Sequence, residues 1–373
     1  MISKTLHLYI LITIFGLLFG LTIFFISNHS IVNIQFSFVF AQTNEDTIYN
    51  SSMIVVDSLD VKNEALSSWN DGIMKNGIID FVKNVTDGNS DYYIPSSDRI
   101  AVFDNDGTLW SEKPFYFQGF FSFDRFKELV VINPNIRQDP KIKDILDKNF
   151  TNFNELTEKD VMDILLITHS NISQTEFNKM VIDWSKTAKH PETKQLFVNM
   201  VYQPMIELIN FLKNNQFKIF IVSGGGVDFI REALSSVYGI PPEQIIGSSI
   251  KYEYIDRINA NESTNIKYND TSFILRESTI NSINNEYEKP ANIQLHIGKV
   301  PVIAVGNSDG DLQMLEYVYE NNEIGQSLPI LIHHDDEKRE YSYDKGAENV
   351  LKDAKENNWL IISMKKDFKK IYP

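Results

Sequence analysis

The sequence predicts an α/β protein with a parallel sheet at its core and a helical insertion after the first core strand. Apolar runs typical of buried strands alternate with amphipathic helical patterns. Polar and acidic clusters directly follow several of these runs. One stretch of about 90 residues, between the first and second core strands, has helical periodicity and no strand pattern. These observations place any functional site at the carboxyl edge of the sheet.

Composition limits the classes of partner. The 373 residues are 43% hydrophobic, which is enough to bury a large core. Thirty-five basic residues against 50 acidic ones give a net charge of -15. This charge argues against nucleic acids and anionic membrane surfaces as partners. With no cysteine, disulfides and thiolate metal sites are excluded.

The N-terminal segment differs from the rest of the chain. No charged residue occurs between Lys4 and Glu45, and residues 8–26 are nearly all apolar. Such a run is long enough to span a bilayer. Residues 39–41, Val-Phe-Ala, resemble a small-residue cleavage site before Gln42.

Residues 1–44 are therefore predicted to be either a secretory signal peptide or an uncleaved membrane anchor, and the sequence leaves both open. In either case the remainder of the chain is expected to be exported, to an extracellular or periplasm-like space. Contact with a membrane is expected only through this segment, if it is not cleaved. Residues 45–67 are polar and mixed, and we interpret them as a linker.

The globular part is predicted to consist of a core, residues 68–110 and 202–373, interrupted by a helical cap, residues 111–201. Within the cap, Thr157 and Ser173 are each followed three residues later by an acidic residue. This spacing is typical of helix N-caps, and apolar residues at helical spacing follow both.

The most informative stretch is residues 100–110, Ile-Ala-Val-Phe-Asp-Asn-Asp-Gly-Thr-Leu-Trp. An apolar run delivers Asp104 and Asp106 directly into a Gly-Thr turn. Two carboxylates this close can face one cleft and attract a divalent cation. Taken alone, the pattern also fits an ordinary strand that ends in an Asx-type turn.

A second polar cluster follows the apolar run 217–222. It reads Ser223-Gly224-Gly225-Gly226 and opens a helical pattern. A serine and bare glycine amides at a strand end can bind an anion, although an ordinary glycine-rich turn has the same composition. Beside the Asp104 turn, at the carboxyl edge of a parallel sheet, the cluster becomes a candidate phosphate site.

Two further strand patterns end in polar residues. Residues 302–305 lead into Gly-Asn-Ser-Asp-Gly-Asp, residues 306–311. Residues 328–332 lead into His-His-Asp-Asp, residues 333–336, which we interpret as a solvated loop rather than a second metal site. The chain is predicted to finish with a helix and one more strand.

Together these stretches resemble the haloacid dehalogenase (HAD) superfamily of phosphohydrolases over roughly residues 68–373. Four stretches resemble motifs I to IV in order: 103–108, 222–224, Lys289-Pro290 and 306–311. The residue sequence of the last motif is similar to that of an exported, phosphoserine-phosphatase-like branch of the superfamily. The resemblance implies a Rossmann-like core, and the helical insertion corresponds to a C1 cap.

The resemblance also implies a reaction. Asp104 would attack phosphorus and form an aspartyl phosphate. Asp106 would protonate the leaving alkoxide and later deprotonate water. The Ser223 hydroxyl, the Gly224 amide and a lysine would bind the other phosphoryl oxygens.

A Mg²⁺ ion is implied, held by Asp104, the backbone carbonyl of Asp106 and motif IV. Here the chain departs from the family, because Asn307 stands where the motif has an aspartate. A neutral amide oxygen can bind magnesium but brings less charge. Asp309 and Asp311 are the residues that could compensate.

The motif III lysine has two candidates, Lys289 and Lys299. We favour Lys289, because Lys-Pro at a helix start, followed by the motif IV strand, is the arrangement of the superfamily. Lys299 is so close to that strand's start that it could lie at the wrong edge of the sheet.

Substrate contacts are expected from Thr108, Gly224 and Glu112, and specificity from the cap. The aromatic residues after Trp110 could line the pocket or pack in the core. The resulting prediction is a Mg²⁺-dependent phosphomonoester hydrolase that acts on a small phosphorylated metabolite. The alternative is a catalytically weak HAD-like binding or scaffold protein of the cell envelope, which the substitution at Asn307 favours.

Overall fold

The computed structural model describes residues 66–146, 156–256, 272–322 and 326–373, all within one compact unit, residues 58–373. The predicted N-terminal segment 1–44 and nearly all of the predicted linker lie outside the described residues. Within the described ranges, no helix has the length and apolar character needed to cross a membrane.

The core is a seven-stranded sheet with the order β4-β3-β2-β1-β5-β6-β7, in which every neighbouring pair except β3 and β4 is parallel. The predicted α/β class with a mostly parallel sheet is confirmed. The strands are β1 (Ile100–Phe103), β2 (Lys218–Gly226), β3 (Ile245–Ile255), β4 (Phe273–Ser282), β5 (Ile303–Gly306), β6 (Leu328–His333) and β7 (Leu360–Ser363).

The central strand β1 is buried on both faces, which explains its continuous apolar sequence. Because side chains alternate along a strand, Ala101 and Phe103 pack into one cluster, whereas Ile100 and Val102 pack into the other. The first cluster is covered by α2 (Ile73–Thr86), α7 (Gln203–Asn214), α8 (Val227–Tyr238) and α13 (Met364–Asp367). The second is covered by α10 (Glu288–His296), α11 (Leu312–Glu320) and α12 (Glu348–Glu356).

Helices also fill the described part of the insertion between β1 and α7. As the spacing predicts, the Thr157 side chain closes a capping box and the Ser173 hydroxyl accepts from the Glu176 amide. These elements are α3 (Phe117–Ile132), α4 (Pro140–Leu146), α5 (Glu158–His169) and α6 (Gln174–Ser185), with 3₁₀ turns η1 (Pro134–Gln138) and η3 (Phe197–Asn199).

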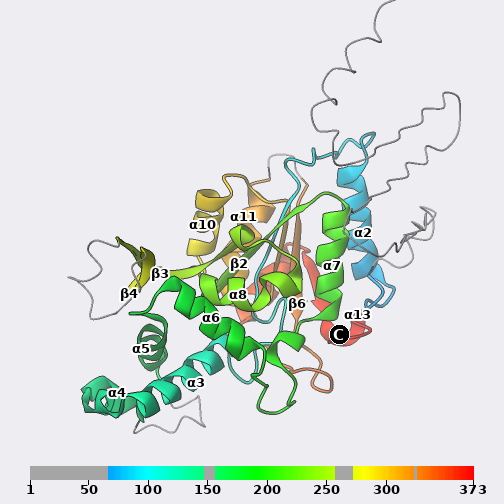
Figure 1. The fold of residues 1–373 in the computed structure, drawn as a ribbon. Helices are drawn as coiled ribbons and strands as arrows, with labels where there is room; N and C mark the ends of the chain where they lie inside the picture. Colours follow the sequence, from blue (N-terminus) through cyan, green and yellow to red (C-terminus); the bar gives the residue numbers. More distant parts are fainter. Residues whose placement is uncertain (1–65, 147–155, 257–271, 323–325) are drawn as a thin grey trace, which may run out of the picture. The chain divides into compact units, whose positions relative to one another are not determined.

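A β-hairpin made of β3 and β4 extends the sheet and lies on the same side as α5 and α6 (Figure 1). The hairpin and the cap are joined by backbone hydrogen bonds. The Asn171 amide donates to the Arg276 carbonyl at 2.7 Å, and the Arg276 amide donates to the Ile172 carbonyl at 3.0 Å. The cap and the hairpin therefore form one wall above the sheet.

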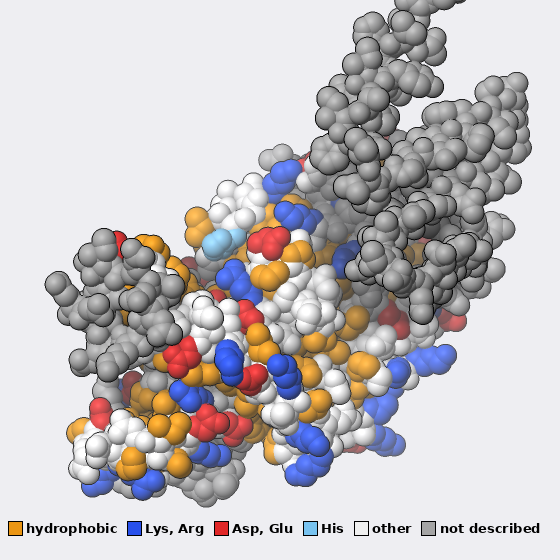
Figure 2. Space-filling model, in the orientation of Figure 1, with side chains coloured by type: hydrophobic (Ala, Val, Ile, Leu, Met, Phe, Trp, Pro, Cys, Tyr) orange, Lys and Arg blue, Asp and Glu red, His pale blue; other side chains and the backbone are white. Residues whose placement is uncertain are grey.

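The surface carries both signs of charge. On the face that Figure 2 shows, basic and acidic side chains are interspersed among hydrophobic and uncharged ones. The absence of a nucleic-acid partner stays a prediction from the net charge.

Trp69 fastens the start of the described chain to its end. Its buried indole donates from Nε1 to the Pro204 carbonyl at 2.9 Å and meets the Phe368 ring edge-on at 4.9 Å. The neighbouring Asn70 amide donates to the Asp367 carbonyl at 2.8 Å.

We expect Trp69→Ala to lower the free energy of unfolding by about 3–5 kcal/mol, because it leaves a cavity and an unpaired carbonyl. Urea denaturation measures the change. Ile73→Ala is the control, since Ile73 is 83% exposed and its loss should cost less than about 0.5 kcal/mol. Equal effects of the two substitutions would contradict the anchoring role of Trp69.

Candidate active site

The site begins at the carboxyl end of β1. Asp104 follows the strand directly, is buried, and donates its amide to the Val305 carbonyl at 2.9 Å. The turn then reverses at Gly107, whose φ is +78°. A Cβ at this position would lie 2.1 Å from Asn307 Nδ2, so both backbone angle and space require glycine.

A lysine from α10 reaches the first carboxylate. Lys289 Nζ donates to Asp104 Oδ1 at 2.6 Å and to Asp311 Oδ1 at 2.5 Å. Lys299 instead pairs with exposed Asp98 at 2.6 Å, before the amino end of β1. The structure thus brings Lys289, and not Lys299, to Asp104.

The buried ion cluster carries one excess negative charge when all three groups are ionised. Burial and the charge of Asp311 raise the pKa of Asp104 well above its ordinary value, against the opposing effect of Lys289. Burial by itself favours a neutral Lys289, but the two carboxylates outweigh it and raise the pKa of the ammonium. A second cation bound beside this cluster would neutralise the excess negative charge.

Asp106 lies in a different electrostatic environment. Burial raises its pKa to about 6, although the Trp110 Nε1 donor, 2.9 Å from Oδ1, favours the ionised form. A carboxyl that titrates near 6 can both give and take a proton close to neutral pH.

The glycine-rich turn at the end of β2 faces Asp106. Gly224 and Gly225 line the same cavity as the two aspartates. Ser223 is fully buried and does not line it; its Oγ accepts from the Gly225 amide at 3.0 Å. The Ser223 carbonyl accepts from Asn284 Nδ2 at 2.9 Å, which holds the turn against the segment before α10. The predicted role of the Ser223 hydroxyl stays a prediction.

The 3₁₀ turn η5 (Asp309–Asp311) separates the two aspartates of motif IV. Asp311 is buried, and its Oδ2 accepts from the amides of Asn307 and Ser308 at 2.9 and 3.0 Å. The Asp309 oxygens instead accept from the Val350 amide and Asn349 Nδ2, both in α12. The structure therefore brings Asp311, but not the Asp309 side chain, into the cluster around Lys289.

The residues predicted to hold a metal fit a hard cation. Within the described part of the chain, no group of three or more His, Asp or Glu side chains is arranged to hold a metal. The Nδ2 of Asn307 is buried without a hydrogen-bond partner. Because an amide can turn end for end, that position can also present an oxygen. The Asp104 carboxylate and the Asn307 amide thus offer oxygen donors beside an excess negative charge, which suits a hard cation.

The carboxylates open into a cavity of about 320 Å³, here called the catalytic cavity. Glu112 lies in its wall, and its Oε1 accepts from the Tyr343 hydroxyl at 2.5 Å and faces Lys113 Nζ at 3.3 Å. Thr108 does not line the cavity; its hydroxyl donates to Asn307 Oδ1 at 3.1 Å. The cap contributes mainly apolar side chains: Phe115, Tyr116, Phe123, Val161, Ile164 and Leu165. Some of the aromatic residues after Trp110 thus line the cavity. Others pack in the core, where Phe117 and Phe121 are buried together with Trp110.

The interpretation of residues 333–336 as a solvated loop is wrong for His334 and Asp336, which are buried. His334 Nε2 contacts the Gly107 carbonyl at 2.7 Å and Nδ1 contacts Glu340 Oε2 at 3.1 Å. Through this contact His334 holds the turn that carries Asp106 in place. A run of four polar residues gave no signal of this burial.

Gln118 is a further residue that the sequence did not indicate, since it lies within an aromatic helix. Its Oε1 accepts from the Gly226 amide at 2.7 Å, and its Nε2 lies 3.2 Å from His169 Nε2. Burial, together with the charge of Arg276, lowers the pKa of His169 to about 3, so the imidazole is neutral. Gln118 therefore connects the cap to the glycine-rich turn.

Comparisons with known proteins give fold-level likenesses. A scan against protein-family models and a search of curated proteins found no match. A phosphoserine phosphohydrolase-like protein from Francisella tularensis is similar, with 19% identity, 68% of this chain and 92% of the other covered, and a TM-score of 0.36. A HAD family hydrolase from Salmonella enterica serovar Typhi has 14% identity, coverages of 73% and 69%, and a TM-score of 0.35. A probable phosphoserine phosphatase from Vibrio cholerae has 12% identity, coverages of 64% and 57%, and a TM-score of 0.34.

All four motif stretches lie at the carboxyl edge of the parallel sheet, as the resemblance implied. Membership of the HAD superfamily stays a prediction from the sequence motifs.

The pKa of Asp106 predicts a pH-dependent effect of Asp106→Asn on stability. In the unfolded chain Asp106 has the ordinary pKa of 3.8, so it loses its proton at a lower pH than in the folded protein. Between about pH 4 and 7 the folded state therefore binds more protons than the unfolded state. Wild-type stability should therefore fall relative to the variant as pH rises. The folded and unfolded pKa values of Asp106 differ by about 2, which corresponds to a change of about 3 kcal/mol in the free energy of unfolding. Partial contact with solvent reduces this change to about 2 kcal/mol.

The measurement is urea denaturation in EDTA at several pH values. A constant difference between wild type and Asp106→Asn across this range would show that the pKa of Asp106 is not raised.

Proposed function

We propose that the protein is an exported, Mg²⁺-dependent phosphomonoester hydrolase that forms an aspartyl phosphate on Asp104. The observation that carries this proposal is the shared cavity of Asp104 and Asp106, with Lys289 fixed on Asp104. Export is proposed from the charge-free N-terminal sequence alone.

In the first step, an Asp104 oxygen attacks phosphorus while the bond from phosphorus to the ester oxygen breaks. Protonated Asp106 gives its proton to the departing alkoxide. Lys289 and the amide of Gly224 supply donors for the oxygens that do not react.

In the second step, the Asp106 carboxylate takes a proton from water. The water oxygen attacks phosphorus, the acyl-phosphate bond to Asp104 breaks, and inorganic phosphate leaves. The pKa of about 6 suits Asp106 to both directions of proton transfer.

Asp104, the Asp106 carbonyl and Asn307 would hold the metal. When bound, Mg²⁺ offsets the repulsion between the substrate phosphate and the buried carboxylates. Asn307 contributes less charge than an aspartate, so we propose a weakly held ion that is lost readily to chelators.

The decisive test is phosphate release from p-nitrophenyl phosphate by the full-length protein, with Mg²⁺ or with EDTA. We expect activity that requires metal and falls at least about a thousandfold in Asp104→Asn. Asp309→Asn is the matched control, because the Asp309 side chain binds α12, and we expect its rate within about threefold of wild type.

An Asp104→Asn variant as active as wild type would overturn the proposed nucleophile, and activity in EDTA would overturn the metal requirement. Folded protein that binds phosphate in calorimetry but releases none from any ester would favour the alternative, a binding protein, which the neutral Asn307 supports.

The role of Asp106 predicts a dependence on the leaving group. An alkoxide needs a proton to depart, whereas p-nitrophenolate does not. We therefore expect Asp106→Asn to lower kcat/KM for an alkyl phosphate by about 10²–10⁴ and for p-nitrophenyl phosphate much less. Steady-state kinetics on both esters measures the two ratios, and equal losses would show that Asp106 is not the acid of the first step.

A further inference from the structure

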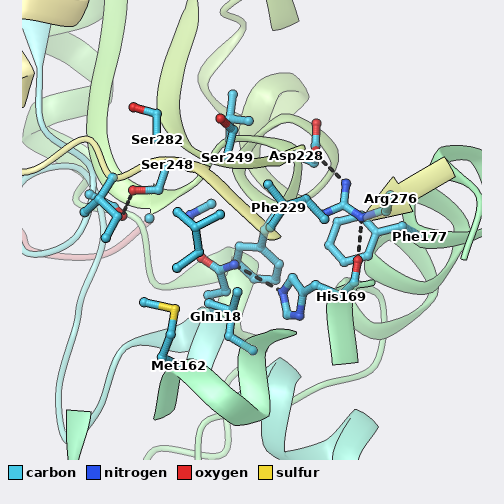
Figure 3. Close-up of a pocket in the computed structure, with 18 residues that line it drawn as sticks. Gln118, Met162, His169, Phe177, Asp228, Phe229, Ser248, Ser249, Arg276 and Ser282 are labelled. Atoms are coloured by element: carbon cyan, nitrogen blue, oxygen red, sulfur yellow. Dashed lines mark hydrogen bonds and ion pairs between the residues drawn. The ribbon is translucent and has the colours of Figure 1, made fainter. Parts of the chain in front are cut away.

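A second cavity, here called the distal cavity, has a volume of about 140 Å³ and lies between the cap, α8 and the β3–β4 hairpin. Figure 3 shows Met162 and Gln118 on the side opposite Ser248 and Ser282. The residues assigned to catalysis, Asp104, Asp106 and Lys289, do not line this cavity.

The distal cavity adjoins the catalytic cavity. Leu165 and Gln118 from the cap, together with the glycine-rich turn, line both. The shared residues are Gln118, Leu165, Gly224, Gly225 and Ile283. Gln118 therefore lies at the boundary between the two cavities.

The charged groups in the distal cavity are satisfied by one another. Arg276 forms an ion pair with Asp228 and donates to the His169 carbonyl at 2.7 Å and to Gln174 Oε1 at 2.6 Å (Figure 3). Its guanidinium also stacks 3.8 Å from the centre of the Phe177 ring. Neutral His169 adds no charge, so the cavity has no unpaired charge to offer a ligand.

The remaining surface is mostly apolar. Its apolar part is formed by Met162, Leu165, Phe177, Val227, Phe229, Ile250, Ile280 and Ile283, and its uncharged polar part includes Ser248, Ser249 and Ser282. Among the residues that the structure describes, Lys289 and the paired Arg276 are the cationic side chains that line the two cavities. A second anionic group on the substrate would thus be buried without a free cation, at high cost in solvation.

We propose that the distal cavity receives the far end of the leaving group, so the substrate is a phosphomonoester of an uncharged, largely apolar alcohol. This inference rests on the proposed phosphatase function. The phosphate occupies the catalytic cavity, and the hydrocarbon part extends past Gln118 between the cap and the hairpin.

Chain length is the variable that tests the proposal. Steady-state kinetics with the full-length protein and Mg²⁺ compares ethyl, butyl and hexyl phosphate. We expect kcat/KM to rise about threefold to fourfold for each methylene that enters the distal cavity. The anionic analogue 6-(phosphonooxy)hexanoate should lose this gain.

Ile280→Trp fills the distal cavity from β4, where a bulky aromatic side chain suits an extended strand. We expect it to flatten the chain-length series, so that butyl and hexyl phosphate lose their advantage over ethyl phosphate. Ile274→Trp is the matched control on the same strand, since Ile274 lines neither cavity. It should keep the wild-type slope.

A flat series in wild type, an unchanged slope in Ile280→Trp, or equal rates with hexyl phosphate and its carboxylate analogue would each overturn the proposal while leaving phosphatase activity intact. No phosphate release from any ester, p-nitrophenyl phosphate included, would overturn the proposed function and this inference with it.

Discussion

The structure depends on how the buried ammonium of Lys289 is compensated. A fully buried cation is tolerated only when paired, and Asp104 and Asp311 both bind it directly. This contact joins the end of β1, the helix α10 and the turn η5 in one cluster. Removing Lys289 would leave two carboxylates buried without their cation, so a residue of the candidate site also holds the core elements together.

Much of the fold was predictable because its signals are local. The buried central strand is a continuous apolar run, and the N-caps of α5 and α6 follow from Thr157 and Ser173. The sequence did not predict the antiparallel pairing of β3 with β4. The register of such a pair depends on the surface that the hairpin covers, which no local pattern shows. That surface is the cap, which contacts β4 from far away in sequence.

The predicted site residues differ in how far sequence could place them. Motif spacing placed Asp104, Asp106 and Lys289, because strand ends in a parallel sheet meet at one edge. It could not separate Asp309 from Asp311, since one 3₁₀ turn sends them to opposite sides. His334 and Gln118 were missed for a related reason: each acts through a backbone group of a distant loop, and no local pattern marks such a contact.

The order of strands has a consequence for how the chain is made. β1 lies between β2 and β5, and both are synthesised well after it. An emerging chain therefore carries this apolar strand without a hydrogen-bonding partner until β2 has been made. The contact between Asp104 and Lys289 joins residues 185 positions apart, so it can form only after most of the chain has been made.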